Sequence, residues 1–147
     1  MPKVEIRLNS DALDQIHRAA MDAALETVGA VRTEVQSAQV VPMNNGELQG
    51  SMNISQTVDG NDIVTSLNAD EPYARFIYFG KLMVAKNGSS WAKKGEQKTV
   101  IEKSLNFQKG NNPNAQAEWL KPWLPGGENE DFMKETFVKT LEKRLQK

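Results

Sequence analysis

The feature that most constrains the fold of this chain is one apolar stripe through residues 13–38. Apolar side chains recur there every three or four residues, at Leu13, Ile16, Ala20, Ala24, Val28, Val31, Val35 and Ala38. This spacing predicts a single amphipathic helix of about 28 residues, which would be about 40 Å long. Because the stripe is rich in Ala and Val, whose small side chains permit close approach, we expect the helix to lie across a sheet.

Period-two patterns on both sides of this helix predict strands. Residues 3–8 alternate apolar and charged side chains, which is typical of a short strand with one wet face. Residues 48–58 alternate in the same way, and residues 63–67 return as the partner strand. Between them, Asp59 and Gly60 suit a tight turn that needs a positive φ.

The second half of the chain has weaker patterns until its last helix. Residues 73–79 are aromatic and largely apolar, and fit either a third strand or a short helix. Residues 81–116 predict a long, irregular and flexible loop, in which residues 99–105 form a brief strand or a helical turn. Residues 120–125 contain two prolines and must be extended or turned. A final helix is predicted from an apolar face formed by Phe132, Met133, Phe137, Leu141 and Leu145.

Charge is divided unevenly along the chain, although the net charge is only −1. Residues 1–80 carry 5 basic and 11 acidic side chains, whereas residues 81–109 carry 7 Lys and 2 Glu. A basic segment beside an acidic one can bind polyanions, or can let copies of one chain dock head to tail. The alternative is a Lys-rich loop that is simply solvated.

Composition excludes several kinds of functional site. The absence of Cys excludes disulfides, thiolate metal sites and a Cys nucleophile. A lone His17 excludes a multi-His metal cage, and with Asp14 it leaves a hydrolase only as a formal alternative. The chain has no glycine-rich phosphate loop, so we expect no cofactor and no metal. It also has no apolar run of membrane-spanning length and no apolar signal-peptide core, which predicts a cytoplasm-like compartment.

Aromatic residues supply the candidate contact sites. Trp91 stands near Lys93, Lys94 and Lys98, so this segment could stack nucleic-acid bases and meet phosphates, or could mediate assembly. The alternative is that Trp91 anchors an otherwise loose loop onto the domain. Four further candidates for core or subunit contacts are Tyr73, Phe76, Tyr78 and Phe79.

A proline lies between two further tryptophans near residue 120. Trp119 and Trp123 flank Pro122, an arrangement that suits anchors in a protein–protein pocket. The same side chains could equally fill the base of the core.

Two stretches resemble elements of phage head–tail neck proteins. Residues 42–51 (PMNNGELQGS) look like their P-x-x-x-G-x-L-x-x-S turn and strand. Residues 73–80 (YARFIYFG) look like their Y-A-x-x-x-x-x-G element, with Tyr78 where many members carry Glu.

Three further stretches resemble one branch of these proteins more closely. They are residues 80–84, the Ser-Trp-Ala-Lys stretch at 90–93, and the run over 105–119. The branch is the minor capsid proteins of tailed phages and prophages of Gram-positive bacteria. The resemblance covers roughly residues 40–124, and the order and spacing of the motifs carry it.

The resemblance implies a structural role without catalysis or cofactor. Such proteins form a ring between the head connector and the tail-tube or tail-terminator proteins, which implies a hexamer in the virion. We expect the free subunit to be a monomer, because ordering the long loop costs free energy until partners supply contacts. DNA would make only transient, non-specific contact, and the host cytoplasm would be the place of assembly. The implied fold is a single α+β domain over residues 1–147, in which a long N-terminal helix packs on a curved antiparallel sheet beside a C-terminal helix. The loop over 81–116 would order on assembly.

Overall fold

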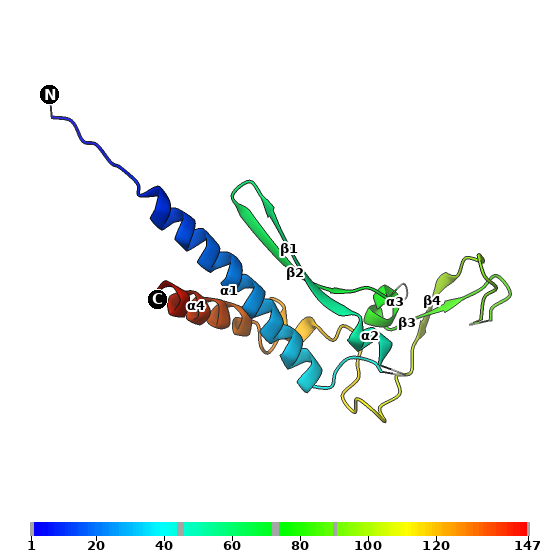
Figure 1. Cartoon of the computed structure of the whole chain (residues 1–147). Coiled ribbons are helices and arrows are strands. Elements are labelled where there is room, and N and C mark those ends of the chain that lie inside the picture. Colours follow the sequence, from blue (N-terminus) through cyan, green and yellow to red (C-terminus); the bar gives the residue numbers. More distant parts are fainter. Residues whose placement is uncertain (1, 44–45, 72–73, 90, 147) are drawn as a thin grey trace.

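The structure, a computed structural model, describes residues 2–43, 46–71, 74–89 and 91–146 (Figure 1). Its elements are α1 (Ser10–Ser37), α2 (Glu47–Gly50), β1 (Met52–Asp59), β2 (Asp62–Ala69), α3 (Ala74–Phe79), β3 (Lys81–Val84), β4 (Thr99–Ser104), η1 (Lys121–Trp123) and α4 (Asp131–Leu145). The predicted α+β class, with a long N-terminal helix and a C-terminal helix, is confirmed. A curved sheet is replaced by two separate two-stranded sheets, β1–β2 and β3–β4.

The first helix has the length that the apolar stripe predicted. α1 contains 28 residues, and the Asn9 side chain caps it by accepting hydrogen bonds from the backbone N–H groups of Asp11 (3.0 Å) and Ala12 (3.2 Å). Past its end, Gln39 takes a positive φ of 56° and turns the chain toward the body of the molecule. The capped start fixes where the extended N-terminal segment leaves the helix.

The last helix, α4, runs antiparallel to the second half of α1. Phe132 and Met133, at its start, pack against the core. Near its end, a guanidinium nitrogen of Arg144 lies 3.2 Å from the Asp22 carboxylate, and Arg144 also pairs with Glu26. α4 therefore lies beside the middle of α1 and ends close to Asp22, so the N-terminal turns of α1 extend beyond it (Figure 1).

The predicted hairpin is present and lies beside α1. β1 and β2 pair antiparallel from Met52↔Ala69 to Asp59↔Asp62, and Gly60 in the turn has a φ of 59°. The Gln56 side-chain amide donates to the Met21 carbonyl oxygen of α1 at 2.9 Å. The long helix thus contacts a sheet, although that sheet has only two strands.

Two predictions for the middle of the chain need correction or completion. The strand predicted from residue 48 begins only at Met52, because a left-handed Gly46 (φ 86°) leads into the helical turn α2, which buries Leu48. The aromatic segment, which sequence left open between strand and helix, forms the short helix α3.

The segment over 81–116 contains a second sheet. The brief strand that was one of the two expectations for residues 99–105 is present as β4, whereas β3 stands where only loop was expected. β3 and β4 pair antiparallel, with a shift of register between Lys81 and Leu82. The chain turns from α3 into β3 at Gly80, whose φ is 63°. A Cβ at Gly80 would come within 2.9 Å of the Ala117 Cβ, so only glycine allows this close approach.

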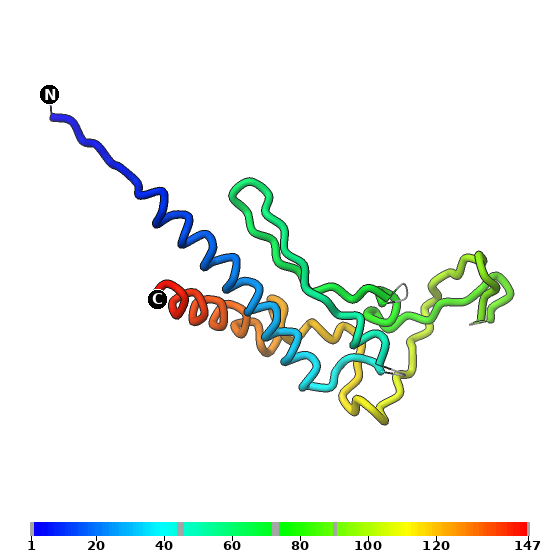
Figure 2. The backbone as a smooth tube through the Cα atoms, viewed as in Figure 1, coloured from blue at the N-terminus to red at the C-terminus, as the bar shows by residue number. Residues whose placement is uncertain are grey.

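The N-terminal strand predicted over residues 3–8 has no partner in either sheet. Residues 2–9 form an extended arm that continues beyond the free end of α1 (Figure 2). Its alternating pattern is present, but α1 carries the arm away from both hairpins.

The core sits where the C-terminal end of α1 meets α2, α3, η1 and the base of the β1–β2 hairpin (Figure 1). Its buried side chains are Val31, Val35, Val40, Val41, Leu48, Met52, Ala74, Trp119 and Trp123. The segment before Trp119 is tied to this junction by Asn112, whose buried amide donates to the Val41 carbonyl oxygen at 2.7 Å. The rest of the molecule extends outward from this small centre.

Candidate assembly surfaces

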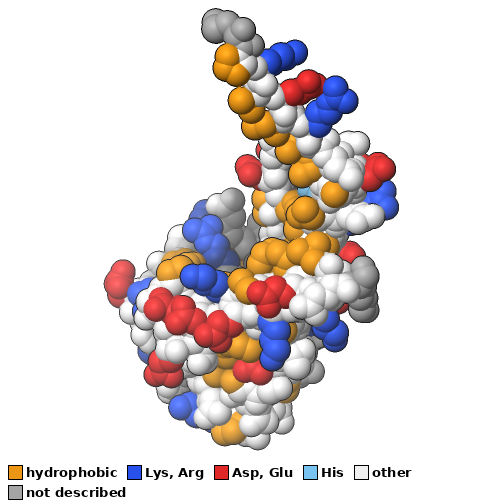
Figure 3. Space-filling view, turned by 90° about the vertical axis from the view of Figure 1, so that its left-hand side faces the viewer, with side chains coloured by type: hydrophobic (Ala, Val, Ile, Leu, Met, Phe, Trp, Pro, Cys, Tyr) orange, Lys and Arg blue, Asp and Glu red, His pale blue; other side chains and the backbone are white. Residues whose placement is uncertain are grey.

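An apolar surface runs along the arm and the first half of α1. It consists of Val4, Ile6, Leu8, Leu13 and Ile16, which are between 48% and 87% exposed. Figure 3 shows apolar side chains gathered along one side of this projection and continuing onto the body. We call these five residues the N-terminal apolar surface. Contiguous exposed apolar surface of this kind marks interaction sites in soluble proteins.

This surface is exposed because the elements that cover α1 are too short. At 1.5 Å per residue, the 15 residues of α4 span about 22 Å, against about 42 Å for the 28 residues of α1. Residues 10–18 of α1 are therefore all exposed, and the apolar stripe continues through them at Leu13 and Ile16. The sequence interpretation placed both residues on the stripe that was expected to lie across a sheet. The signal that reveals them is the difference between the predicted lengths of the two helices.

A second candidate surface lies on the β3–β4 hairpin and its connection, which we call the basic lobe (residues 81–104). Lys93, Lys94 and Lys98 are exposed there, and Trp91 is 80% exposed. The Lys93 backbone N–H donates to the Glu96 carboxylate at 3.1 Å, which closes a tight turn around Lys94. The idea that Trp91 anchors the loop onto the domain is therefore wrong, because its indole lies mostly in solvent.

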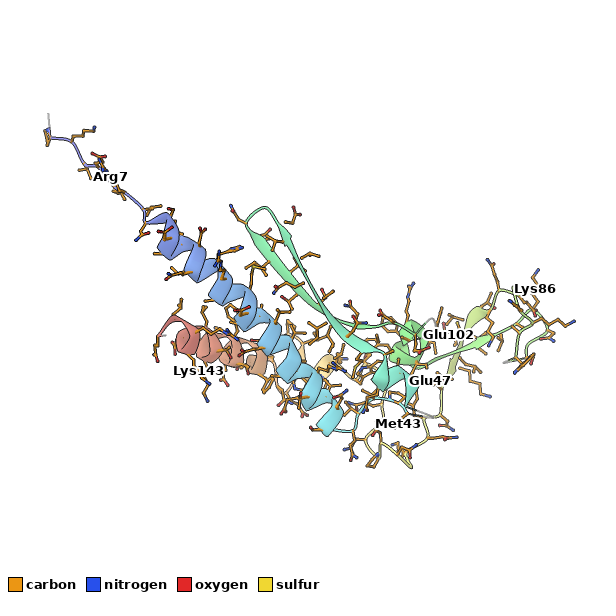
Figure 4. All side chains as sticks on the ribbon, in the orientation of Figure 1. Arg7, Met43, Glu47, Lys86, Glu102 and Lys143 are labelled. Atoms are coloured by element: carbon orange, nitrogen blue, oxygen red, sulfur yellow. The ribbon has the colours of Figure 1, made fainter. Side chains whose placement is uncertain are left out.

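The two surfaces lie at opposite ends of the molecule. Figure 4 places Arg7 on the projecting arm and Lys86 at the far end of the basic lobe. The body between them carries the core and the contact between α1 and the β1–β2 hairpin. A chain with an apolar surface at one end and a basic surface at the other presents two different faces to its neighbours.

The tryptophans near residue 120 belong to the core. Trp119 and Trp123 are 2% and 3% exposed, and Pro122 between them is half-buried. This burial favours packing over the docking role as the explanation for both indoles.

The aromatic candidates of α3 divide between core and surface. Tyr78 contacts Trp119 edge to face, Phe76 is half-buried, and Phe79 is 51% exposed. Tyr73 lies outside the described residues.

An open apolar cavity of about 280 Å³ lies beside this aromatic group. Met52 and Leu67 of the hairpin form one side of it, and Tyr78 and Trp119 form another. Burial raises the pKa of the Tyr78 hydroxyl above its ordinary value of 10.0, and the nearby Glu118 carboxylate adds to the shift. The phenol is therefore neutral at physiological pH, and the cavity presents apolar surface and not a reactive group.

The residues considered for catalysis or metal binding lie apart from this cavity. His17 and Asp14 are exposed on the projecting half of α1. Among the described residues, no group of three or more Asp, Glu, His or Cys side chains is placed to hold a metal ion. In that same part of the chain, no helix has both the length and the apolar character needed to cross a membrane.

Comparison with known proteins gives no significant match to a family model, a curated protein or a solved structure.

Proposed function

We propose that this chain is a structural subunit of a tailed phage or prophage virion, which assembles with its own copies into a ring at the head–tail junction. The observation that carries the proposal is the N-terminal apolar surface, which none of the described elements of the chain covers. A monomer gains nothing by exposing such a surface, whereas an assembly subunit uses it. The resemblance of residues 40–124 to minor capsid and neck proteins supplies the virion context.

Two unlike faces on one chain support a ring in particular. An interface that joins different surfaces of identical subunits is heterologous, and it closes into a ring when its rotation divides a full turn. The N-terminal apolar surface is one such face, and in a ring it meets a different surface of the next copy. The basic lobe lies at the opposite end of the molecule, where it is open to another neighbour (Figure 4). In this proposal the ring contacts the head connector on one side and tail-tube or tail-terminator proteins on the other, and the chain is not an enzyme.

Particles made without the chain test this role. We expect deletion of its coding sequence from the phage or prophage to leave separate heads and tails in electron micrographs. Supplying the unaltered chain from a plasmid should restore joined particles. Joined particles in the complete absence of the chain would remove it from the junction.

A second candidate function, nucleic-acid binding, rests on the basic lobe. Trp91 is free to stack on a base, and Lys93 and Lys94 are exposed close to it in the sequence. Such a module would bind single-stranded DNA with an affinity that falls steeply as salt is raised. Filter binding of the purified chain at several salt concentrations separates the two functions, because a neck subunit lets DNA pass without holding it.

A further inference from the structure

We infer that the N-terminal arm of one copy adds as a third strand to the free edge of the β1–β2 hairpin of a neighbouring copy. This rests on the self-assembly in the proposed function and names the contact that makes it. Strand addition of this kind supplies affinity through main-chain hydrogen bonds and specificity through alternating side chains.

The arm already has the pattern of a strand that lacks a partner. Its apolar residues Val4, Ile6 and Leu8 are 87%, 81% and 75% exposed, and they alternate with charged residues. In an extended chain, this alternation places all three apolar side chains on one face. A strand with one apolar face is stable only when a sheet or another body covers that face.

The β1–β2 hairpin is correspondingly incomplete. A two-stranded hairpin is marginal alone, and each of its strands leaves an unpaired row of backbone N–H and C=O groups. The register places Ile54 opposite Leu67 and Val58 opposite Ile63, so the four apolar side chains share one face, with the Gln56–Thr65 pair between them. Val58 is 47% exposed, which leaves room for more apolar surface at the turn end of that face.

Length distinguishes this hairpin from the other one. β1 and β2 contain 8 residues each, enough to pair with the whole alternating segment over residues 3–8. β3 contains 4 residues and β4 contains 6, and their pairing shifts register between Lys81 and Leu82. A short and irregular edge offers fewer successive main-chain hydrogen bonds to an added strand.

Charge favours the same hairpin. The arm carries Lys3, Glu5 and Arg7 on the face opposite its apolar side chains, a net charge of +1, and Glu5 pairs with Arg7 at 2.8 Å. Asp59 and Asp62 flank the turn of the β1–β2 hairpin. The basic lobe would instead place these two cations near several Lys side chains. With apolar faces aligned, the basic residues of the arm lie on the same side of the sheet as the two aspartates.

The direction of α1 indicates that a neighbouring copy, and not the same chain, receives the arm. The arm leaves the capped end of α1 and points away from the body, whereas its own hairpin lies along the helix (Figure 2). An arm that projects past its own sheet can reach the sheet of the next copy without bending the chain at Asn9. Repeating this contact around a closed set of subunits produces a heterologous ring.

Disulfide trapping in the full-length chain tests the contact, because the native sequence has no Cys. Two single-cysteine chains are mixed and oxidised: Glu5→Cys on the arm with Thr57→Cys on β1, or with Val64→Cys on β2. We expect a disulfide-linked heterodimer with one of these two hairpin positions, and the position identifies the edge used. Gln97→Cys in the basic lobe is the matched control, and it should give no such heterodimer.

Three results would overturn the inference. One is an oligomer that forms without any arm–hairpin cross-link, and another is preferential cross-linking to the lobe position. The third is a disulfide inside one chain in the double variant Glu5→Cys/Thr57→Cys at high dilution, which would show that the arm folds back. None of these results bears on the head–tail role, which the particle experiment decides. Failure of the arm–hairpin contact and failure of the proposed function can therefore be told apart.

A variant with a disrupted arm tests whether the arm is needed for assembly. Ile6→Asp places a charge on the apolar face of the arm, and we expect loss of oligomer on size-exclusion chromatography with light scattering. Because Ile6 is 81% exposed, thermal unfolding of the monomer should not change. An Ile6→Asp chain that assembles normally would count against the inference.

Discussion

The ring of Tyr78 meets the ring of Trp119 edge to face, with centroids 4.8 Å apart and planes at 74°. The contact joins α3 to the segment just before η1, and the Glu118 backbone N–H donates to the Tyr78 carbonyl oxygen beside it. Edge-to-face pairs are worth about 0.5–1.5 kcal/mol beyond the area they bury. The body of the molecule therefore depends on aromatic packing, whereas its projecting ends do not.

Substitution of two tryptophans distinguishes a core residue from a surface residue by the effect on the free energy of unfolding. Trp119→Ala should lower the free energy of unfolding by about 3–5 kcal/mol, because it removes a buried indole from the core. Trp91→Ala should change it by less than about 0.5 kcal/mol, since that indole is 80% exposed. Urea denaturation followed by circular dichroism measures both values. Equal losses in the two variants would contradict this assignment of core and surface.

The pKa of Tyr78 predicts a loss of stability at high pH. Its pKa is raised in the folded chain, chiefly by burial and then by Glu118, so folding favours the protonated phenol. The resulting contribution is complete below the unfolded pKa of about 10 and disappears as pH rises through the higher folded value. Tyr78→Phe should therefore flatten the fall in stability above pH 10.

Tyrosinate absorbance measures the same effect directly. In a Tyr73→Phe chain, Tyr78 is the remaining tyrosine, and its titration in the native state should occur above that of the urea-unfolded chain. Coincident native and unfolded titration curves would show that Tyr78 is not buried as described.

Gly127 is the glycine with the least room for a side chain. A Cβ at this position would lie 2.2 Å from the Lys121 carbonyl oxygen and 2.5 Å from that of Pro122. Gly127→Ala must therefore displace the backbone between η1 and α4, and should lower the free energy of unfolding by about 1–3 kcal/mol. Gly110→Ala is the control, because a Cβ added there has open space around it. The free energy of unfolding of this variant should be nearly unchanged. Thermal denaturation of the two variants makes the comparison.

Local patterns predicted the elements whose stabilising contacts lie close together in sequence. The stripe from Leu13 to Ala38 gave the first helix, and Asp59-Gly60 gave the turn of the β1–β2 hairpin. The prediction was wrong at α2, where a helical turn stands in place of the start of a strand. The alternation at Leu48 and Gly50 fits a strand as well as a short helical turn that buries one residue. Period alone does not decide such short segments.

Contacts between distant segments were beyond prediction. Asn112 lies in a stretch rich in Asn and Gly that is typical of a loop, yet it is 4% exposed. Its amide donates to the carbonyl oxygen of Val41 and to the Gln49 side chain, both far away in the sequence. The exposed half of α1 was missed for a related reason: an apolar stripe predicts that a helix is covered, but not by which element or over what length.

Charge reversal in the basic lobe tests its part in assembly. Lys93→Glu/Lys94→Glu exchanges two exposed cations for anions without touching the core, so circular dichroism and unfolding should match the unaltered chain. If the lobe meets an acidic face of a neighbour, this double variant should fail to restore head–tail joining in particles made without the chain. Lys134→Glu/Lys139→Glu, on exposed positions of α4, makes the same change in net charge and should restore joining. Joining at normal levels by the lobe variant would refute an electrostatic role for these lysines.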